Sequence, residues 1–361
     1  MGKNIKIIIA AAVAVVAVAA IVACLFVFDF FGSDLPKYAP DGTDLIVYVN
    51  GKKLVKTKVF KAYKKTLVYE ELVKASQKEG IDTDKALQGE ACLFFNISDA
   101  MEGKGEWGPT VIYRGSQAGA VFKAMQKNAE KSVSDAEKRA AEARKEAEKD
   151  GREPSEDETF VPTLSTDKIS GKQAYVFGAK YRNAAAIMLD KKTLQFSQVS
   201  RKENLIAEPL KKKSTDLTKA IDTGAIVSIV WKADIPEDLF KGNDNPAAKL
   251  AKSAVDGLEI VTLNVKESGG SLKVTLVGRY KSSEKANAAK EAVIALRKLA
   301  QDDLAGKDKY EDAADMLKAL EISQRGKKVT VTLKYSEDKL VAMIEKADRE
   351  FRELRKEIEK K

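Results

Sequence analysis

Apolar and polar residues repeat along this chain with two periods, every second residue in some segments and every three to four residues in others. In its first half, this pattern predicts a strand, a helix, two strands, a helix and three short strands, in that order. Their ranges are 45–49, 52–78, 92–97, 110–113, 117 onward, 173–177, 186–189 and 194–196. A short helix over 201–211 is expected to end this half.

The second half follows a similar order of strand, helix, hairpin, helix, hairpin and helix. Its segments are 225–231, 247–255, 259–265, 272–280, 283–300, 320–323 and 329–333. A last helix starts after Ser336, whose hydroxyl suits an N-cap. We therefore predict an α+β fold with two diverged repeats of strand-helix-hairpin-helix-hairpin-helix, in which helices cover antiparallel or mixed sheets.

The repeats predict two domains, 44–215 and 216–361. A length of 361 residues agrees with this, because a single hydrophobic core rarely grows that large. The first domain carries a charged helical insertion, 126–158. The second ends in a long helix, 336–361.

Both of these helical segments carry apolar residues at heptad spacing. In the insertion the positions are small: Val133, Ala136, Ala140, Ala143 and Ala147. In the last helix they are larger: Leu340, Ile344, Ala347, Phe351, Leu354 and Ile358. Such a stripe packs either on its own domain or on a second helix, so two interpretations stay open. The second predicts that these helices pair with each other or with a protein partner.

The N-terminus predicts attachment to a membrane. Residues 7–28 are uncharged and long enough to span a bilayer as a helix, after a basic segment, 1–6. The positive charges keep the N-terminus in the cytoplasm, so a linker, 29–43, leads to domains outside the bacterial inner membrane. Ile21-Val22-Ala23-Cys24 also resembles a lipobox, so lipidation at Cys24 is an alternative, as is cleavage with secretion.

Composition removes several kinds of chemistry. The chain has no histidine, which excludes histidine-based catalytic relays and the usual Cys/His zinc sites. Its two cysteines, Cys24 and Cys92, are not expected to pair. Residues 103–108 match the dinucleotide fingerprint G-x-G-x-x-G, but a strand follows where that site requires a helix. Ser-x-x-Lys pairs, such as Ser282 with Lys285, are better explained as helix caps.

The charge balance suggests a second kind of surface. The net charge is +9, of which Lys3 and Lys6 contribute two. Lys56, Lys61 and Lys64 lie within one predicted helix, 52–78. They form either a solvated helix face or a patch for an anionic surface, such as phospholipid head groups or an envelope polysaccharide. Nucleic acid is not expected as a partner, because the domains are exported.

Two segments resemble a family of bacterial proteins. The first is the opening Leu35-Pro36 to Pro40-Asp41-Gly42-Thr43-Asp44-Leu45-Ile46-Val47-Tyr48, with Lys53-Leu54 and Val59-Phe60-Lys61 after it. The second is the closing Arg325-Gly326-Lys327 to Ser336-Glu337-Asp338. Both resemble exported or membrane-anchored tandem α+β proteins of Planctomycetes, Verrucomicrobia and Lentisphaerae. The resemblance implies location and architecture, and it brings no activity and no site residues.

These observations favour a non-catalytic binding or scaffold protein of the cell envelope, without a cofactor. The alternative is a carboxylate- or metal-dependent hydrolase or transferase in a groove between the domains. Converging buried carboxylates would indicate that alternative.

Overall fold

The computed structural model describes residues 34–97, 107–180, 182–200, 210–233, 235, 240, 245–307 and 310–359. The predicted membrane segment 7–28, Cys24 and most of the predicted helix 201–211 lie outside these ranges. Within them, every helix is too short or too polar to cross a membrane.

The described residues form two compact units. Unit 1 contains residues 45–70 and 215–361, and unit 2 contains residues 34–44 and 71–214. The sequence places one boundary near 215, but it assigns 45–70 to the first domain. In the structure β1 (Leu45–Asn50) pairs antiparallel with β8 (Val227–Lys232), with Val47 opposite Ile229. This pairing brings the first apolar strand into the unit of the C-terminal half.

Among its described residues, unit 1 contains six strands in the order β11-β12-β10-β9-β8-β1, and each pair of neighbours within this order is antiparallel. The remaining bounds are Leu258–Glu267 for β9, Ser271–Tyr280 for β10, Leu320–Arg325 for β11 and Lys328–Ser336 for β12. Both predicted hairpins are confirmed. The first turns at Gly269 and Gly270, whose φ angles of 57° and 72° favour glycine.

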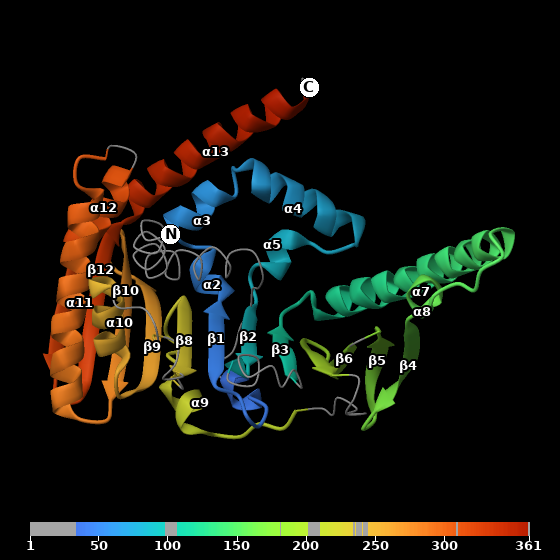
Figure 1. Cartoon of the computed structure of the whole chain (residues 1–361), viewed down its shortest axis with the longest axis horizontal. Helices are drawn as coiled ribbons and strands as arrows, with labels where there is room; N and C mark the ends of the chain where they lie inside the picture. The colour runs from blue at the N-terminus through green and yellow to red at the C-terminus, as the bar shows by residue number, and fades with distance from the viewer. Residues whose placement is uncertain are drawn as a thin grey trace. The chain divides into compact units, whose positions relative to one another are not determined.

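Helices cover this sheet because they carry small residues where they meet it. Tyr280 and Val329 pack against Ala286 and Ala289 of α11 (Ser283–Leu304), which runs along β10, β11 and β12 (Figure 1). The other helices of the second half are α9 (Asp216–Ala220), α10 (Pro246–Val255), α12 (Glu311–Lys318) and α13 (Glu337–Glu359).

The long helix predicted over 52–78 is three helices instead: α2 (Gly51–Leu54), α3 (Lys58–Tyr63) and α4 (Leu67–Lys78). Local side-chain caps explain the breaks. Thr57 Oγ1 accepts a hydrogen bond from Phe60 N at 3.0 Å, and Thr66 Oγ1 accepts one from Tyr69 N at 3.3 Å. Each hydroxyl accepts a hydrogen bond from an N–H that has no partner within the first turn of a helix. A new helix therefore starts after each of these threonines.

Unit 2 contains the other six strands in the order β2-β3-β7-β6-β5-β4, again antiparallel. Their bounds are Glu90–Phe95, Trp107–Arg114, Thr193–Ser200, Arg182–Asp190, Lys172–Gly178 and Thr163–Ile169, in the same order. Unit 2 also contains a 3-10 helix, Leu35–Tyr38, the short helices α5 (Thr83–Ala86) and α8 (Glu156–Thr159), the long helix α7 (Ala118–Lys149) and residues 71–78 of α4.

The two halves of the chain repeat α+β elements in a related order. Each has a strand, one or more helices, an antiparallel pair of strands, a long helix and further antiparallel strands. They differ after the long helix, because the first half continues with four strands, β4 to β7, where the second has the hairpin β11–β12 and then α13.

Candidate partner-binding face of helix α13

Helix α13 begins directly after strand β12, and its first residues bind the start of α3. Ser336 Oγ accepts a hydrogen bond from Asp338 N at 3.2 Å, which confirms the predicted N-cap. Glu337 is 1% exposed, and its Oε2 accepts a hydrogen bond from Lys58 N at 3.0 Å, at the start of α3. The ion pair between Asp338 and Lys58 Nζ, 2.8 Å, raises the pKa of Lys58. The first turn of α13 thus caps a second helix of unit 1.

Three turns later, α13 makes a second set of polar contacts, with the start of α4. Asp348 Oδ1 accepts a hydrogen bond from Leu67 N at 2.8 Å, and Arg352 Nε donates to Asp348 Oδ2 at 2.7 Å. Arg352 also donates to Glu70 at 2.9 Å and to the Lys65 carbonyl oxygen at 3.2 Å. Burial alone raises the pKa of Asp348, but hydrogen bonds from Arg352 and Leu67 N–H lower it overall. These contacts fix the direction of α13 up to Arg352.

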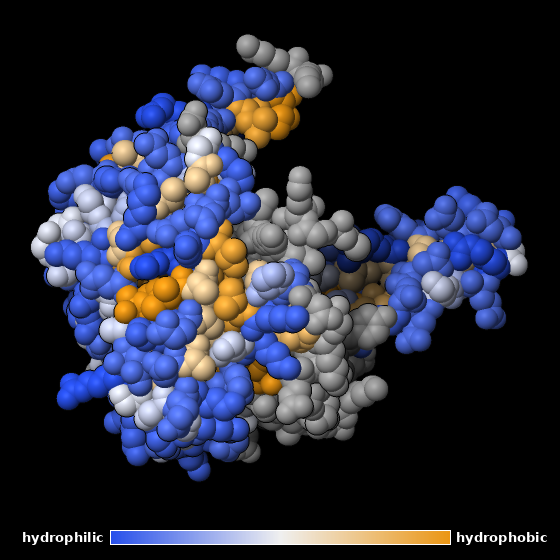
Figure 2. All heavy atoms as spheres, turned by 60° about the vertical axis from the view of Figure 1, so that its left-hand side comes forward, coloured by the Kyte–Doolittle hydropathy of each residue, from blue (hydrophilic) through white to orange (hydrophobic). Residues whose placement is uncertain are grey.

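The predicted heptad positions change from half-buried to exposed between Ile344 and Ala347. Leu340 and Ile344 are half-buried within unit 1, whereas Ala347 is exposed. Phe351, Leu354 and Ile358 are 48%, 53% and 66% exposed, and they are three of the five large hydrophobic side chains exposed among the described residues. Figure 2 shows apolar atoms gathered along one side of α13. We call Ala347, Phe351, Leu354 and Ile358 the exposed seam.

Charged residues border the exposed seam on both sides. In the heptad, Phe351 and Ile358 take position a and Leu354 takes position d, so Glu350 and Glu357 fall at g and Arg355 at e. An apolar stripe with charged flanks is the usual pattern of a helix that packs against another helix. The sequence identified this pattern but not which part of it would be exposed.

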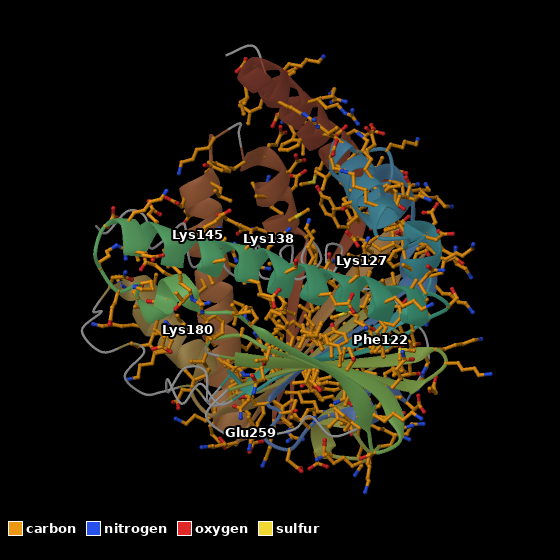
Figure 3. All side chains as sticks on the ribbon, turned by 90° about the vertical axis from the view of Figure 1, so that its right-hand side faces the viewer. Phe122, Lys127, Lys138, Lys145, Lys180 and Glu259 are labelled. Carbon is orange, nitrogen blue, oxygen red and sulfur yellow. The ribbon has the colours of Figure 1, made fainter. Side chains whose placement is uncertain are left out.

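The other heptad helix is used differently. In α7 the small residues Ala136, Ala140 and Ala147 are buried, and Val133 and Ala143 are half-buried. The helix packs on α8 and on strands β4, β6 and β7 of its own unit, while Lys127, Lys138 and Lys145 are exposed along it (Figure 3). The small seam therefore packs on its own domain, as the first of the two interpretations predicts.

A capped turn brings the chain back onto α7. Ser155 and Glu158 form a capping box at the start of α8, and Arg152 donates two hydrogen bonds to the Glu158 carboxylate, at 2.9 and 3.0 Å. Hydrogen bonds from Arg152 and Ser155 lower the pKa of Glu158 to about 2. Because the carboxylate stays charged down to acidic pH, its hydrogen bonds from Arg152 and Ser155 help to keep α8 in contact with α7.

The candidate lysines all lie at the surface. Lys61 belongs to α3, Lys56 precedes it and Lys64 follows it, and all three are exposed while Val59 and Phe60 are buried. Lys64 Nζ lies 5.7 Å from the centre of the Tyr69 ring. An anionic ligand for these lysines stays a prediction.

The remaining candidate chemistry has structural explanations. Cys92 is fully buried in β2, and burial, with a smaller effect of Glu90, raises the pKa of its thiol well above the ordinary value. Ser282 Oγ accepts a hydrogen bond from Lys285 N at 3.2 Å, which confirms its role as a cap of α11. Gly108 lies in strand β3, whereas Gly103 and Gly105 lie outside the described residues. Over the described ranges, Cys, Asp and Glu side chains form no group of three or more suited to a metal ion.

Comparisons with known proteins find only distant similarity. No family model and no curated protein matches the chain. Crystal form III of TP0453 is 10% identical, with a TM-score of 0.43 over 86% of this chain and 97% of that one. Crystal form I is 7% identical, with a TM-score of 0.40 over 87% and 97% of the two chains. These TM-scores are too low to establish a shared fold.

Proposed function

We propose that this chain is a non-catalytic binding or scaffold protein of the bacterial cell envelope, which holds a protein partner through the exposed seam of α13. One observation carries the proposal. Helix α13 is fixed to α3 and α4 through Glu337, Asp348 and Arg352, while Phe351, Leu354 and Ile358 on another face of its outer half are exposed to solvent.

This arrangement suits binding for a physical reason. Covering apolar surface contributes about 25 cal/mol per Å². Binding by a flexible segment also loses conformational entropy, and a helix already fixed over half its length loses less of it. The exposed seam therefore offers apolar area at a small ordering cost.

The cellular location in this proposal comes from the sequence. The uncharged segment 7–28 after the basic segment 1–6 supports a single-pass anchor in the inner membrane, with both units on the outer side. Lipidation at Cys24 or secretion would also put the units outside the cytoplasm. The exposed Lys56, Lys61 and Lys64 support a weaker, salt-sensitive contact with an anionic envelope polymer.

Site-specific photo-crosslinking tests the proposal. We would place a photoreactive amino acid at position 354 of the full chain in bacterial membranes, and at position 299 as the control. Leu299 is an exposed leucine of the same unit, 40% exposed, on α11. We expect a discrete cross-linked product from position 354 alone. The same products from both positions, or none from position 354, would argue against a binding face on α13.

A further inference from the structure

We infer that the partner of the exposed seam is a second copy of this chain, and that two α13 helices pair in parallel over residues 347–358. The inference rests on the proposed function and names its partner. It is carried by the charges that border the seam, which fit a parallel copy and conflict with an antiparallel one.

The apolar positions themselves suit a two-stranded pair. In a parallel pair each residue at a or d meets the same residue of the second helix, so Phe351, Leu354 and Ile358 each pack on their own copy. A β-branched residue at a with leucine at d favours two strands, and Ile358 and Leu354 occupy these positions. Asp348 and Arg352 bind the start of α4 on one side of α13, and the seam stays exposed.

The flanking charges choose the orientation. In a parallel pair, a residue at g faces the residue at e five positions later in the second helix, which sets Glu350 opposite Arg355 of the copy, twice per dimer. In an antiparallel pair centred on the seam, residues at g face each other, which sets Glu350 opposite Glu357. Residues at e also face each other, but Asp348, opposite Arg355, is only 15% exposed and is already bound to Arg352 and to Leu67 N. The parallel arrangement therefore gains two attractive contacts and avoids two repulsive ones.

The expected self-association is weak in solution. The seam offers only four apolar positions per chain, whereas a typical stable interface buries at least roughly 1,200 Å² in total and involves many more residues on each side. Anchoring both copies in one membrane would raise their effective concentration without any new contact. We therefore expect a concentration-dependent equilibrium between monomer and dimer.

Charge reversal on the full chain in detergent micelles tests the inference, with dimerisation followed by light scattering over a concentration series. We expect E350R and R355E each to weaken dimerisation by about three- to tenfold, because each turns two attractive contacts into repulsive ones. An equimolar mixture of the two variants should dimerise like the wild type, because both contacts between the different chains are then attractive. The variant E353R, at outward position c of the same turn, is the control and should have no effect.

The possible results separate the two proposals. Stronger dimerisation of E350R would indicate antiparallel helices and overturn the inference. A wild-type chain that stays monomeric at all concentrations would also overturn it. If position 354 still cross-links to a different protein, the proposed function stands and only its assignment to a second copy fails.

Discussion

Replacing Phe351 and Leu354 together with aspartate is expected to leave the full chain monomeric at concentrations where the wild type dimerises. The substitutions remove the two central apolar side chains of the seam, which are 48% and 53% exposed in the single chain. They also place four carboxylates in the interface of the dimer, where charged groups lose hydration without gaining a partner. We expect the dissociation constant to rise more than about 100-fold, which corresponds to roughly 2.7 kcal/mol.

Two results would show that this loss concerns the seam. The far-ultraviolet circular dichroism spectrum should be unchanged, because both side chains are exposed in the single chain. The variant L299D makes the same kind of change on α11, at a residue that is 40% exposed, and it should dimerise like the wild type. Equal dimerisation of wild type and F351D/L354D by light scattering would rule out the seam as the contact.

Replacing Phe60 with alanine is expected to lower the free energy of unfolding of unit 1 by about 3–5 kcal/mol. Phe60 is 1% exposed, and its ring lies 6.0 Å from that of Tyr63 and 6.2 Å from that of Tyr69. Alanine would leave a cavity and remove two aromatic contacts of α3, the helix against which α13 packs. Urea unfolding followed by tyrosine and tryptophan fluorescence measures the change.

The neighbouring residue supplies the control for this prediction. Lys61 is exposed on the same helix, so Lys61→Ala should change the free energy of unfolding by less than about 0.5 kcal/mol. A loss below about 1 kcal/mol for Phe60→Ala would mean that the aromatic cluster does not support α3 as described.

The order of elements could be read from the sequence because hydrophobic period is a local property. The hairpin of β9 and β10 turns at Gly269 and Gly270, and the chain shows both glycines between two apolar runs. The breaks in the helix at Thr57 and Thr66 do not follow from the hydrophobic pattern. A threonine within an otherwise helical pattern is only a weak signal for a helix start. Whether the helix breaks there is decided by tertiary packing.

The assignment of residues to units could not be read in the same way. Strand β1 pairs with β8, which lies about half the chain away, and no local pattern encodes that choice of partner. A strand followed by helices fits either half equally well. The separation of 45–70 from 71–214 therefore appears only once strand pairing is known.

Heptad spacing showed both candidate helices but could not rank them. The small residues of α7 are covered by its own unit, because the turn at Arg152 and Glu158 returns the chain alongside α7. In α13, Arg352 joins the helix to Glu70 of α4, and Leu354 and Ile358, which follow Arg352 in the chain, are exposed. Exposure, unlike spacing, depends on what the rest of the chain covers.

Disulfide formation at position 358 tests parallel pairing most directly. In a full chain with Cys24→Ser, and with Cys92 buried, Ile358→Cys introduces one accessible thiol at position a. Parallel helices bring the two thiols of a dimer together, so mild oxidation is predicted to give a covalent dimer from this variant alone. The account is contradicted if I358C stays monomeric, or if a disulfide forms only when chains with I358C are mixed with chains carrying Ala347→Cys, the residue that an antiparallel copy would bring to position 358.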